Sequence, residues 1–124
     1  MTRDREFQTL YDAANALGKE AAQSCVPVPM IVQGTGLDGV THTYPPVMDG
    51  VCGFAWVKVR PATQPFGRWL KRAGIVDRAS YGGGYDLWIS DYGQSMTRKE
   101  AHAQAMAETL RLAGVDAFAQ SRMD

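Results

Sequence analysis

One strand pattern limits the fold of this chain more than any other feature. Residues 51–60, VCGFAWVKVR, alternate in character with a period of two, as a β-strand requires. One side of this strand carries small and aliphatic side chains: Val51, Ala55, Val57 and Val59. The other side carries aromatic rings and two cations: Cys52, Phe54, Trp56, Lys58 and Arg60. A dry core disfavours the cations and open water disfavours the rings. We therefore expect a packed face and a mixed, ligand-binding face.

Two later segments repeat this division. Residues 85–92, YDLWISDY, and 115–123, VDAFAQSRM, also alternate with the period of a strand. Their aliphatic positions are Leu87, Ile89, Val115, Ala117 and Ala119. Their opposite positions mix rings, charges and hydrogen-bonding groups: Asp86, Trp88, Ser90, Tyr92, Asp116, Phe118, Gln120 and Arg122. The three segments together predict a sheet with one aliphatic face and one aromatic-cationic face.

The chain begins with a predicted amphipathic helix over residues 3–24, for which Thr2 is the expected N-cap. Its apolar residues recur at helical spacing: Phe7, Leu10, Tyr11, Ala14, Leu17 and Ala21. Two prolines follow, so residues 28–32, VPMIV, are expected to form a short edge strand. Residues 33–50 are rich in Gly, Pro, Asp and Thr, which predicts a loop or a small hairpin.

Two further helices are predicted. Residues 65–73 start with a proline in the first turn and stop at Gly74. The last helix begins with a T-x-x-E capping box, Thr97 and Glu100, and ends before Gly114. Its apolar stripe consists of Ala103, Met106, Ala107, Leu110 and Ala113.

This order of elements predicts one α+β domain over residues 1–124. We expect a small, mainly antiparallel four-stranded sheet with an N-terminal helix, a short middle helix and a C-terminal helix. The first and last helices both need a surface to pack on. If they cover opposite faces of the sheet, the aromatic rings are ordinary core; if they do not, the rings are open to a ligand.

The charge of the chain is balanced, with 13 basic and 13 acidic residues, so no overall field attracts nucleic acid or an anionic membrane. The N-terminus lacks the apolar stretch of a signal peptide, and no apolar run approaches the length of a membrane span. We expect a soluble cytoplasmic protein with no membrane partner. Cys25 and Cys52 fit a reducing compartment, although the sequence leaves a disulfide between them open.

Rings and cations on one face fit a ligand that combines flat apolar groups with negative charge. Nucleotides and single-stranded nucleic acids have this chemistry, because bases stack on aromatic rings and Arg or Lys pairs with phosphate. A host protein is an equal alternative, since Trp, Tyr and Arg dominate interface hot spots. The predicted binding residues on the strands are Trp56, Lys58, Arg60, Trp88, Tyr92 and Arg122.

Two other groups of cations extend this predicted site. The middle helix places three cations on one face: Arg68, Lys71 and Arg72. Trp69 points away from that face and is expected to anchor the helix to the core. Arg98 and Lys99, with His102, occupy the first turns of the last helix. Cations there oppose the helix dipole, which points to an anion site at this helix terminus.

No motif predicts catalysis. The G-x-G-x-x-G match at 34–39 is not followed by a helix, and the glycine run within 80–85 is expected to be a turn. The histidines, His42 and His102, have no metal-ligand spacing with the cysteines, and no nucleophile–base pair is recognisable. We therefore expect a binding protein without metal or cofactor. A small enzyme acting on a nucleotide or nucleic acid, or a virion or assembly component, is the alternative.

Three segments resemble a known group of proteins: GFAWVKVRPATQPFGRWLK, YGGGYDLWISDYGQSMTRKEAHAQAMAETLRLAG and the closing VDAFAQSRMD. They are similar to a family of small proteins of unassigned function encoded by tailed phages, prophages and plasmids. The resemblance implies a mobile-element origin, action inside a bacterial host cell and a binding role, such as an anti-defence inhibitor of CRISPR effectors or of nucleotide immune signals. The alanine-rich last helix with Met106, and an edge strand, also allow a homodimer.

Overall fold

The computed structural model describes residues 2–25, 33–35, 41–43, 53–77, 83–93 and 95–123. Its elements, in chain order, are α1 (Thr2–Ser24), β1 (Gln33–Thr35), β2 (Thr41–Thr43), β3 (Gly53–Val59), α2 (Pro65–Arg72), β4 (Tyr85–Trp88), α3 (Met96–Leu112) and β5 (Ala117–Met123). The predicted α+β class is confirmed. Among the described residues the main sheet has three antiparallel strands, and the fourth strand that we expected, over 28–32, lies outside them.

Strand β3 is the centre of the main sheet, whose order is β4-β3-β5, and both neighbours run antiparallel to it. The register places Trp56 opposite Trp88 and Lys58 opposite Asp86 on the β4 side. The short strands β1 and β2 pair with each other in a separate antiparallel sheet. The paired strands agree with the hairpin expected within 33–50, and of the G-x-G-x-x-G match only Gly34 and Thr35 lie among the described residues.

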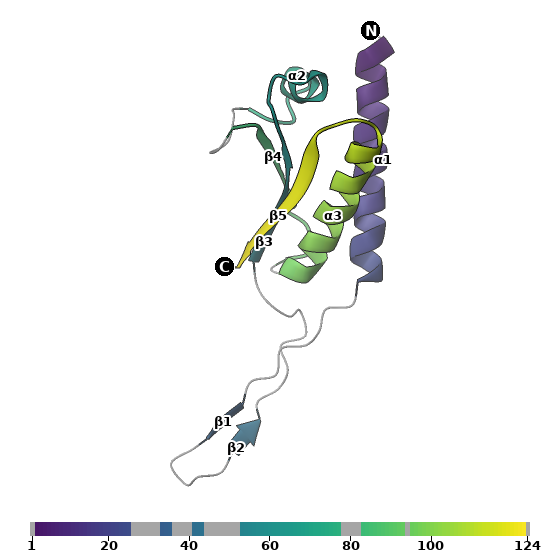
Figure 1. Ribbon diagram of the computed structural model, residues 1–124. Helices are drawn as coiled ribbons and strands as arrows, with labels where there is room; N and C mark the ends of the chain where they lie inside the picture. Colours follow the sequence, from purple (N-terminus) through teal and green to yellow (C-terminus); the bar gives the residue numbers. More distant parts are fainter. Residues whose placement is uncertain are drawn as a thin grey trace.

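The two long helices lie on the same side of the sheet (Figure 1). Helix α3 packs on the aliphatic face, where Ala55, Val57 and Val59 are fully buried. Helix α1 packs on α3 and not on the second face of the sheet. No helix of the described ranges therefore covers the aromatic-cationic face. The two long helices do not take opposite faces of the sheet, which is the arrangement that would have buried the rings in the core.

The predicted stripe of α1 is confirmed in part, because Ala14 is buried and Phe7, Leu10 and Tyr11 pack against the core, while the position of Leu17 differs. Ala14, Gly18 and Ala22 are buried, whereas Leu17 is 46% exposed. The prediction weighted hydrophobic size, but α1 turns its smallest residues toward α3 because they allow a close approach of the two helices. Thr2 is already part of the helix rather than the residue before it.

Aromatic rings fix α2 to the N-terminal half of α1. Phe7 meets Phe66 edge to face, with ring centroids 5.5 Å apart and planes at 84°. Tyr11 lies 6.0 Å from Trp69, whose side chain is only 3% exposed. Such aromatic pairs contribute roughly 0.5–1.5 kcal/mol beyond the area that they bury. The predicted role of Trp69 as an anchor is confirmed.

The ends of α3 show one error and one success of the sequence patterns. Ser95, not Thr97, is the N-cap, and its Oγ accepts a hydrogen bond from the backbone N–H of Arg98 at 3.4 Å. The capping-box match was therefore out of register, because the helix starts earlier at Met96. Gly114 has φ +89°, the left-handed conformation expected of a residue that follows a helix.

Strand β4 ends at Trp88, earlier than predicted, and this removes Tyr92 from the aromatic-cationic face. Tyr92 has φ +73° and lies in a turn, where its carbonyl accepts a hydrogen bond from Ser95 N–H at 3.1 Å. The turn is needed to bring the chain from the sheet to the start of α3. Its side chain then contacts His102 on the helix side of the sheet.

His102 joins three parts of the fold through its ring nitrogens. Its Nε2 lies 2.9 Å from Asn15 Oδ1, and its Nδ1 lies 2.7 Å from the Tyr92 hydroxyl oxygen. With the amide oxygen facing the ring, Nε2–H donates to Asn15 and the Tyr92 hydroxyl donates to Nδ1. The imidazole is only 2% exposed. The neutral form therefore bonds α1, α3 and the β4–α3 turn together.

The surroundings of His102 favour that neutral form. Burial lowers the pKa of His102, the Asp91 carboxylate opposes this change, and the charge of Lys19 adds to it. Burial, together with Asp91, raises the pKa of the Tyr92 hydroxyl, which therefore keeps its proton. Both shifts preserve the hydrogen bonds described above.

No helix in the described part of the chain combines the length and apolar character needed to cross a bilayer. Cys25 is a free thiol whose Sγ lies 4.0 Å from the carbonyl oxygen of Thr97. The disulfide that the sequence left open is therefore not formed, while Cys52 itself lies outside the described residues.

We predict that Gly18→Ala destabilises the protein, although alanine favours a helix by about 1 kcal/mol over glycine. A Cβ at this position would lie 2.4 Å from Cδ2 of the His102 ring, so we expect a net loss of about 1–2 kcal/mol from overpacking. Urea unfolding measures this loss in the free energy of unfolding. In a His102→Ala background the same change should stabilise the protein, and stabilisation in the wild-type background would contradict the close contact.

We predict that stability falls as the pH drops below about 6.5, the ordinary pKa of histidine. Below that pH the unfolded chain binds a proton at His102 that the folded chain does not bind, so the free energy of unfolding decreases until the lowered pKa is reached. Thermal unfolding between about pH 7.5 and about pH 5 measures this dependence of stability on pH. His102→Gln should flatten it and His42→Gln should not; equal slopes in both variants would contradict the prediction.

Candidate functional site

The aromatic-cationic face contains a hollow of about 390 Å³, which we call the sheet-face hollow. Its lining residues come from all three strands of the main sheet and from the residue after β3: Trp56, Lys58, Arg60, Asp86, Trp88, Phe118, Gln120 and Arg122. Among them are five of the predicted binding residues: Trp56, Lys58, Arg60, Trp88 and Arg122. The side-chain alternation of the strands thus brings together residues that are far apart in the sequence.

Two tryptophan rings form the centre of the sheet-face hollow. Trp56 and Trp88 are opposite each other in the register, with ring centroids 4.7 Å apart and planes at 36°. The indole N–H of Trp56 donates to Gln120 Oε1 at 2.8 Å, which fixes the orientation of that ring. Trp88 is 52% exposed. The pair therefore presents an oriented aromatic surface with one ring open to solvent.

Arginine side chains lie at both ends of the tryptophan pair. The Arg60 guanidinium lies 6.0 Å from the centroid of the Phe118 ring, and Arg122 lies 5.4 Å from that of Phe54. Arg122 is opposite Phe54 in the register, so about 20 Å of strand separates the positions of the two arginines. Contact with the rings favours the guanidinium positions by about 0.5–1 kcal/mol at exposed sites.

Lys58 is held inside the face by an internal ion pair. Its Nζ lies 2.9 Å from Asp86 Oδ1, and the two side chains are 7% and 14% exposed. The lysine Nζ also donates to the carbonyl of Gly83 at 3.3 Å. This charge is therefore balanced within the protein, and the cationic character of the hollow comes from its two arginines.

The glycine run before β4 makes this arrangement possible. Gly84 has φ +73°, and a Cβ on it would lie 2.4 Å from the carbonyl oxygen of Val59. Only glycine permits the chain to pass so close to the end of β3. Of the expected turn, Gly83 and Gly84 are described and form a bend, from which the Gly83 carbonyl accepts a hydrogen bond from Lys58.

The cations of α2 do not line the sheet-face hollow. Arg68, Lys71 and Arg72 are exposed on that helix, as predicted from their spacing. Arg72 Nη2 forms an exposed ion pair with Asp4 Oδ1 of α1 at 2.8 Å. Exposed pairs of this kind contribute little to stability. These side chains form a separate surface.

The cations at the start of α3 do not converge on one ligand position either. Lys99 is 5% exposed, donates to the carbonyl of Gly53 at 3.2 Å, and lies 5.5 Å from the Phe54 ring centroid. His102 is engaged with Tyr92 and Asn15. Of the predicted group only Arg98 is left partly exposed without such an inward contact in the part described.

Three lining residues were assigned to the correct face by the sequence but not selected as binding residues. Asp86, Phe118 and Gln120 each follow the alternation of their strands. The selection favoured cations and tryptophans. The structure shows that the three position Lys58, Arg60 and Trp56 respectively, and strand pairing between chemically matched side chains is the signal that would have identified them.

We predict that Lys58→Met destabilises the protein by about 3 kcal/mol, because it leaves the Asp86 carboxylate buried without its cation. The double variant Lys58→Met, Asp86→Leu should recover most of this loss, since apolar residues of similar size often replace a buried ion pair at little cost. Urea unfolding of the single and double variants measures both. Additive losses would show that the two side chains do not interact.

The chain matches no known protein family, no curated protein and no solved structure. The origin in phages or plasmids implied by the sequence resemblance therefore stays a prediction.

Proposed function

We propose that this chain is a non-enzymatic binding protein whose sheet-face hollow holds a short single-stranded nucleic acid. The observation that carries the proposal is the order of groups on this face: an aromatic pair in the middle and an arginine at each end. Aromatic stacking platforms bordered by cations are a general solution for binding single strands.

The aromatic pair supplies a stacking surface. Trp88 is half exposed, and its partner Trp56 is oriented by the hydrogen bond to Gln120. Trp88 contacts this oriented ring, with centroids 4.7 Å apart, so it loses little conformational freedom when a base stacks on it. Stacking of one base on such a ring contributes roughly 1–3 kcal/mol.

The separation of the arginines favours an oligonucleotide over a mononucleotide. A mononucleotide carries its phosphate on one side of the base, whereas a strand has phosphates on both sides of every internal base. Arg60 and Arg122 lie at opposite ends of the tryptophan pair, so a strand that stacks on Trp88 would meet a guanidinium in both directions. Guanidinium groups bind phosphate oxygens through paired hydrogen bonds.

The resemblance to proteins of mobile elements adds a biological setting to this proposal. A small phage or plasmid protein with such a face would act by sequestering a nucleic acid or nucleotide of the bacterial host, as an anti-defence inhibitor does. Binding without turnover is part of the proposal, because the described lining of the hollow contains a carboxylate already paired with Lys58 and no nucleophile activated by a base.

We predict that Trp88→Ala and Arg122→Ala each weaken binding of a fluorescein-labelled oligothymidylate of about 10 nucleotides by about tenfold. Fluorescence anisotropy at two salt concentrations measures the affinity. Arg122→Ala should also reduce the salt dependence, because one phosphate contact is lost. Trp88→Ala should leave that dependence unchanged.

Arg5→Ala is the matched control, since it removes the same charge from α1, which lies beyond α3 from the sheet. Its affinity should equal that of the wild type. Thymidine monophosphate should compete weakly, and the oligonucleotide should be recovered intact. No measurable binding by the wild type, an equal loss in the control, or cleavage of the oligonucleotide would overturn the proposal.

A further inference from the structure

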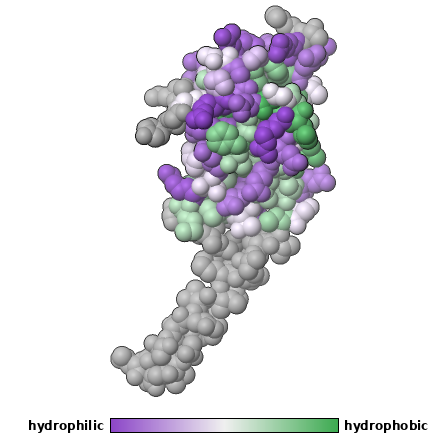
Figure 2. Space-filling view, viewed as in Figure 1, coloured by the Kyte–Doolittle hydropathy of each residue, from purple (hydrophilic) through white to green (hydrophobic). Residues whose placement is uncertain are grey.

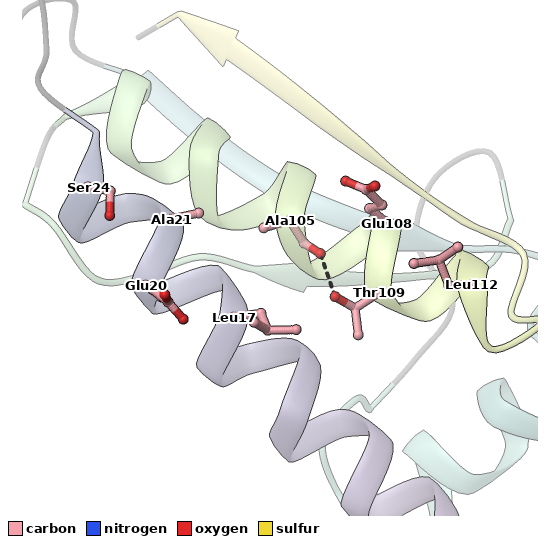
Figure 3. Close-up of a pocket in the computed structure, with 8 residues that line it drawn as sticks. All are labelled: Leu17, Glu20, Ala21, Ser24, Ala105, Glu108, Thr109 and Leu112. Carbon is pink, nitrogen blue, oxygen red and sulfur yellow. Dashed lines mark hydrogen bonds between the residues drawn. The ribbon is translucent and has the colours of Figure 1, made fainter.

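A second hollow, of about 440 Å³, lies between α1 and α3 on the side away from the sheet (Figure 3). We call it the helical groove. Each helix contributes one row of residues spaced by four and then three positions: Leu17, Ala21 and Ser24 from α1, and Ala105, Thr109 and Leu112 from α3. Rows with this spacing lie along one side of a helix and accept the side chains of another helix between them. The rows span about two helical turns, roughly 10 Å.

The lining of the helical groove is apolar and exposed. Leu17 is 46% exposed and Leu112 is 84% exposed, although large hydrophobic side chains usually avoid water. Thr109 does not need a hydrogen-bond partner from a ligand, because its hydroxyl donates to the carbonyl of Ala105 at 2.9 Å. Figure 2 shows hydrophobic surface on the side of the body where Figure 1 places α1. The groove therefore favours an apolar occupant.

The charges at the groove select among such occupants. Glu20 projects from α1 and Glu108 from α3 (Figure 3), and no cation lines the groove among the residues that the structure describes. A second copy related by a twofold axis would bring four carboxylates into one seam, which is unfavourable. Lysine or arginine side chains beside an apolar stripe would pair with both glutamates. Charge complementarity thus favours a basic partner over self-association.

We propose that the helical groove binds an amphipathic helix of another protein, with apolar residues at every third or fourth position and lysine or arginine on both flanks. A helix packed between α1 and α3 would bury Leu17 and Leu112 and place its cations beside Glu20 and Glu108. This site is independent of the sheet-face hollow, because α3 lies between the groove and the sheet. One chain therefore offers a nucleic-acid surface and a protein surface on opposite sides.

The test uses two synthetic helical peptides with the same leucine-alanine stripe, one with lysine flanks and one with glutamate flanks. NMR titration of the full chain should show shifts of the Leu17, Ala105 and Leu112 methyl groups with the lysine peptide only. The double variant Glu20→Lys, Glu108→Lys should bind the lysine peptide at least about tenfold more weakly and should gain binding of the glutamate peptide. Both positions are exposed, so the variant should fold normally.

Asp12→Lys, Asp77→Lys is the matched control, because it makes the same charge change at exposed positions that do not line the groove. It should keep the wild-type preference. Equal binding of the two peptides, an equal loss in the control, or methyl shifts confined to other surfaces would overturn the proposal. A dimer detected by sedimentation and abolished by Ala105→Arg would also overturn it, since the occupant would then be a second copy.

Discussion

The packing of α1 on α3, rather than on the second face of the sheet, determines which surfaces of the molecule can bind anything. Small residues make this packing possible: Ala14, Gly18 and Ala22 let the helices approach closely. The approach is then fixed by the buried imidazole of His102, which bonds to Asn15 of α1 at 2.9 Å. Because one side of the sheet carries both long helices, no helix in the described part of the chain covers the rings and arginines of the other side.

The local periodicity of the sequence was sufficient to predict which residues of the described strands share a face of the sheet. Side chains on a strand must alternate between its two faces, so the assignment of Trp56, Trp88 and Arg122 to one face follows from their positions alone once strands are recognised. The start of α2 was similarly marked by Pro65, and the C-terminal ends of α2 and α3 by Gly74 and Gly114. These features depend on residues within a few positions of each other, which is the range over which a single sequence is informative.

The layer order could not be predicted in the same way, because it depends on contacts between distant parts of the chain. His102 and Asn15 are 87 positions apart, and no pattern in the sequence around either residue predicts that they form a hydrogen bond. Hydrophobic size placed Leu17 inside, whereas the buried position belongs to Gly18, which makes room for the His102 ring. Tyr92 was assigned to the wrong side for the same reason: its turn is required by where α3 must start.

The Lys58–Asp86 pair explains how an aromatic face can also hold charge. An unpaired lysine at the centre of this face would carry a large desolvation cost, but the cross-strand carboxylate at 2.9 Å and the Gly83 carbonyl offset that cost. Lys58 is paired with Asp86, and the guanidinium groups of Arg60 and Arg122 lie toward the two ends of the face. The face therefore has a cationic side chain toward each end and an aromatic region between them. A ligand with alternating flat and anionic groups experiences both regions favourably, whereas a compact anion meets only one arginine at a time.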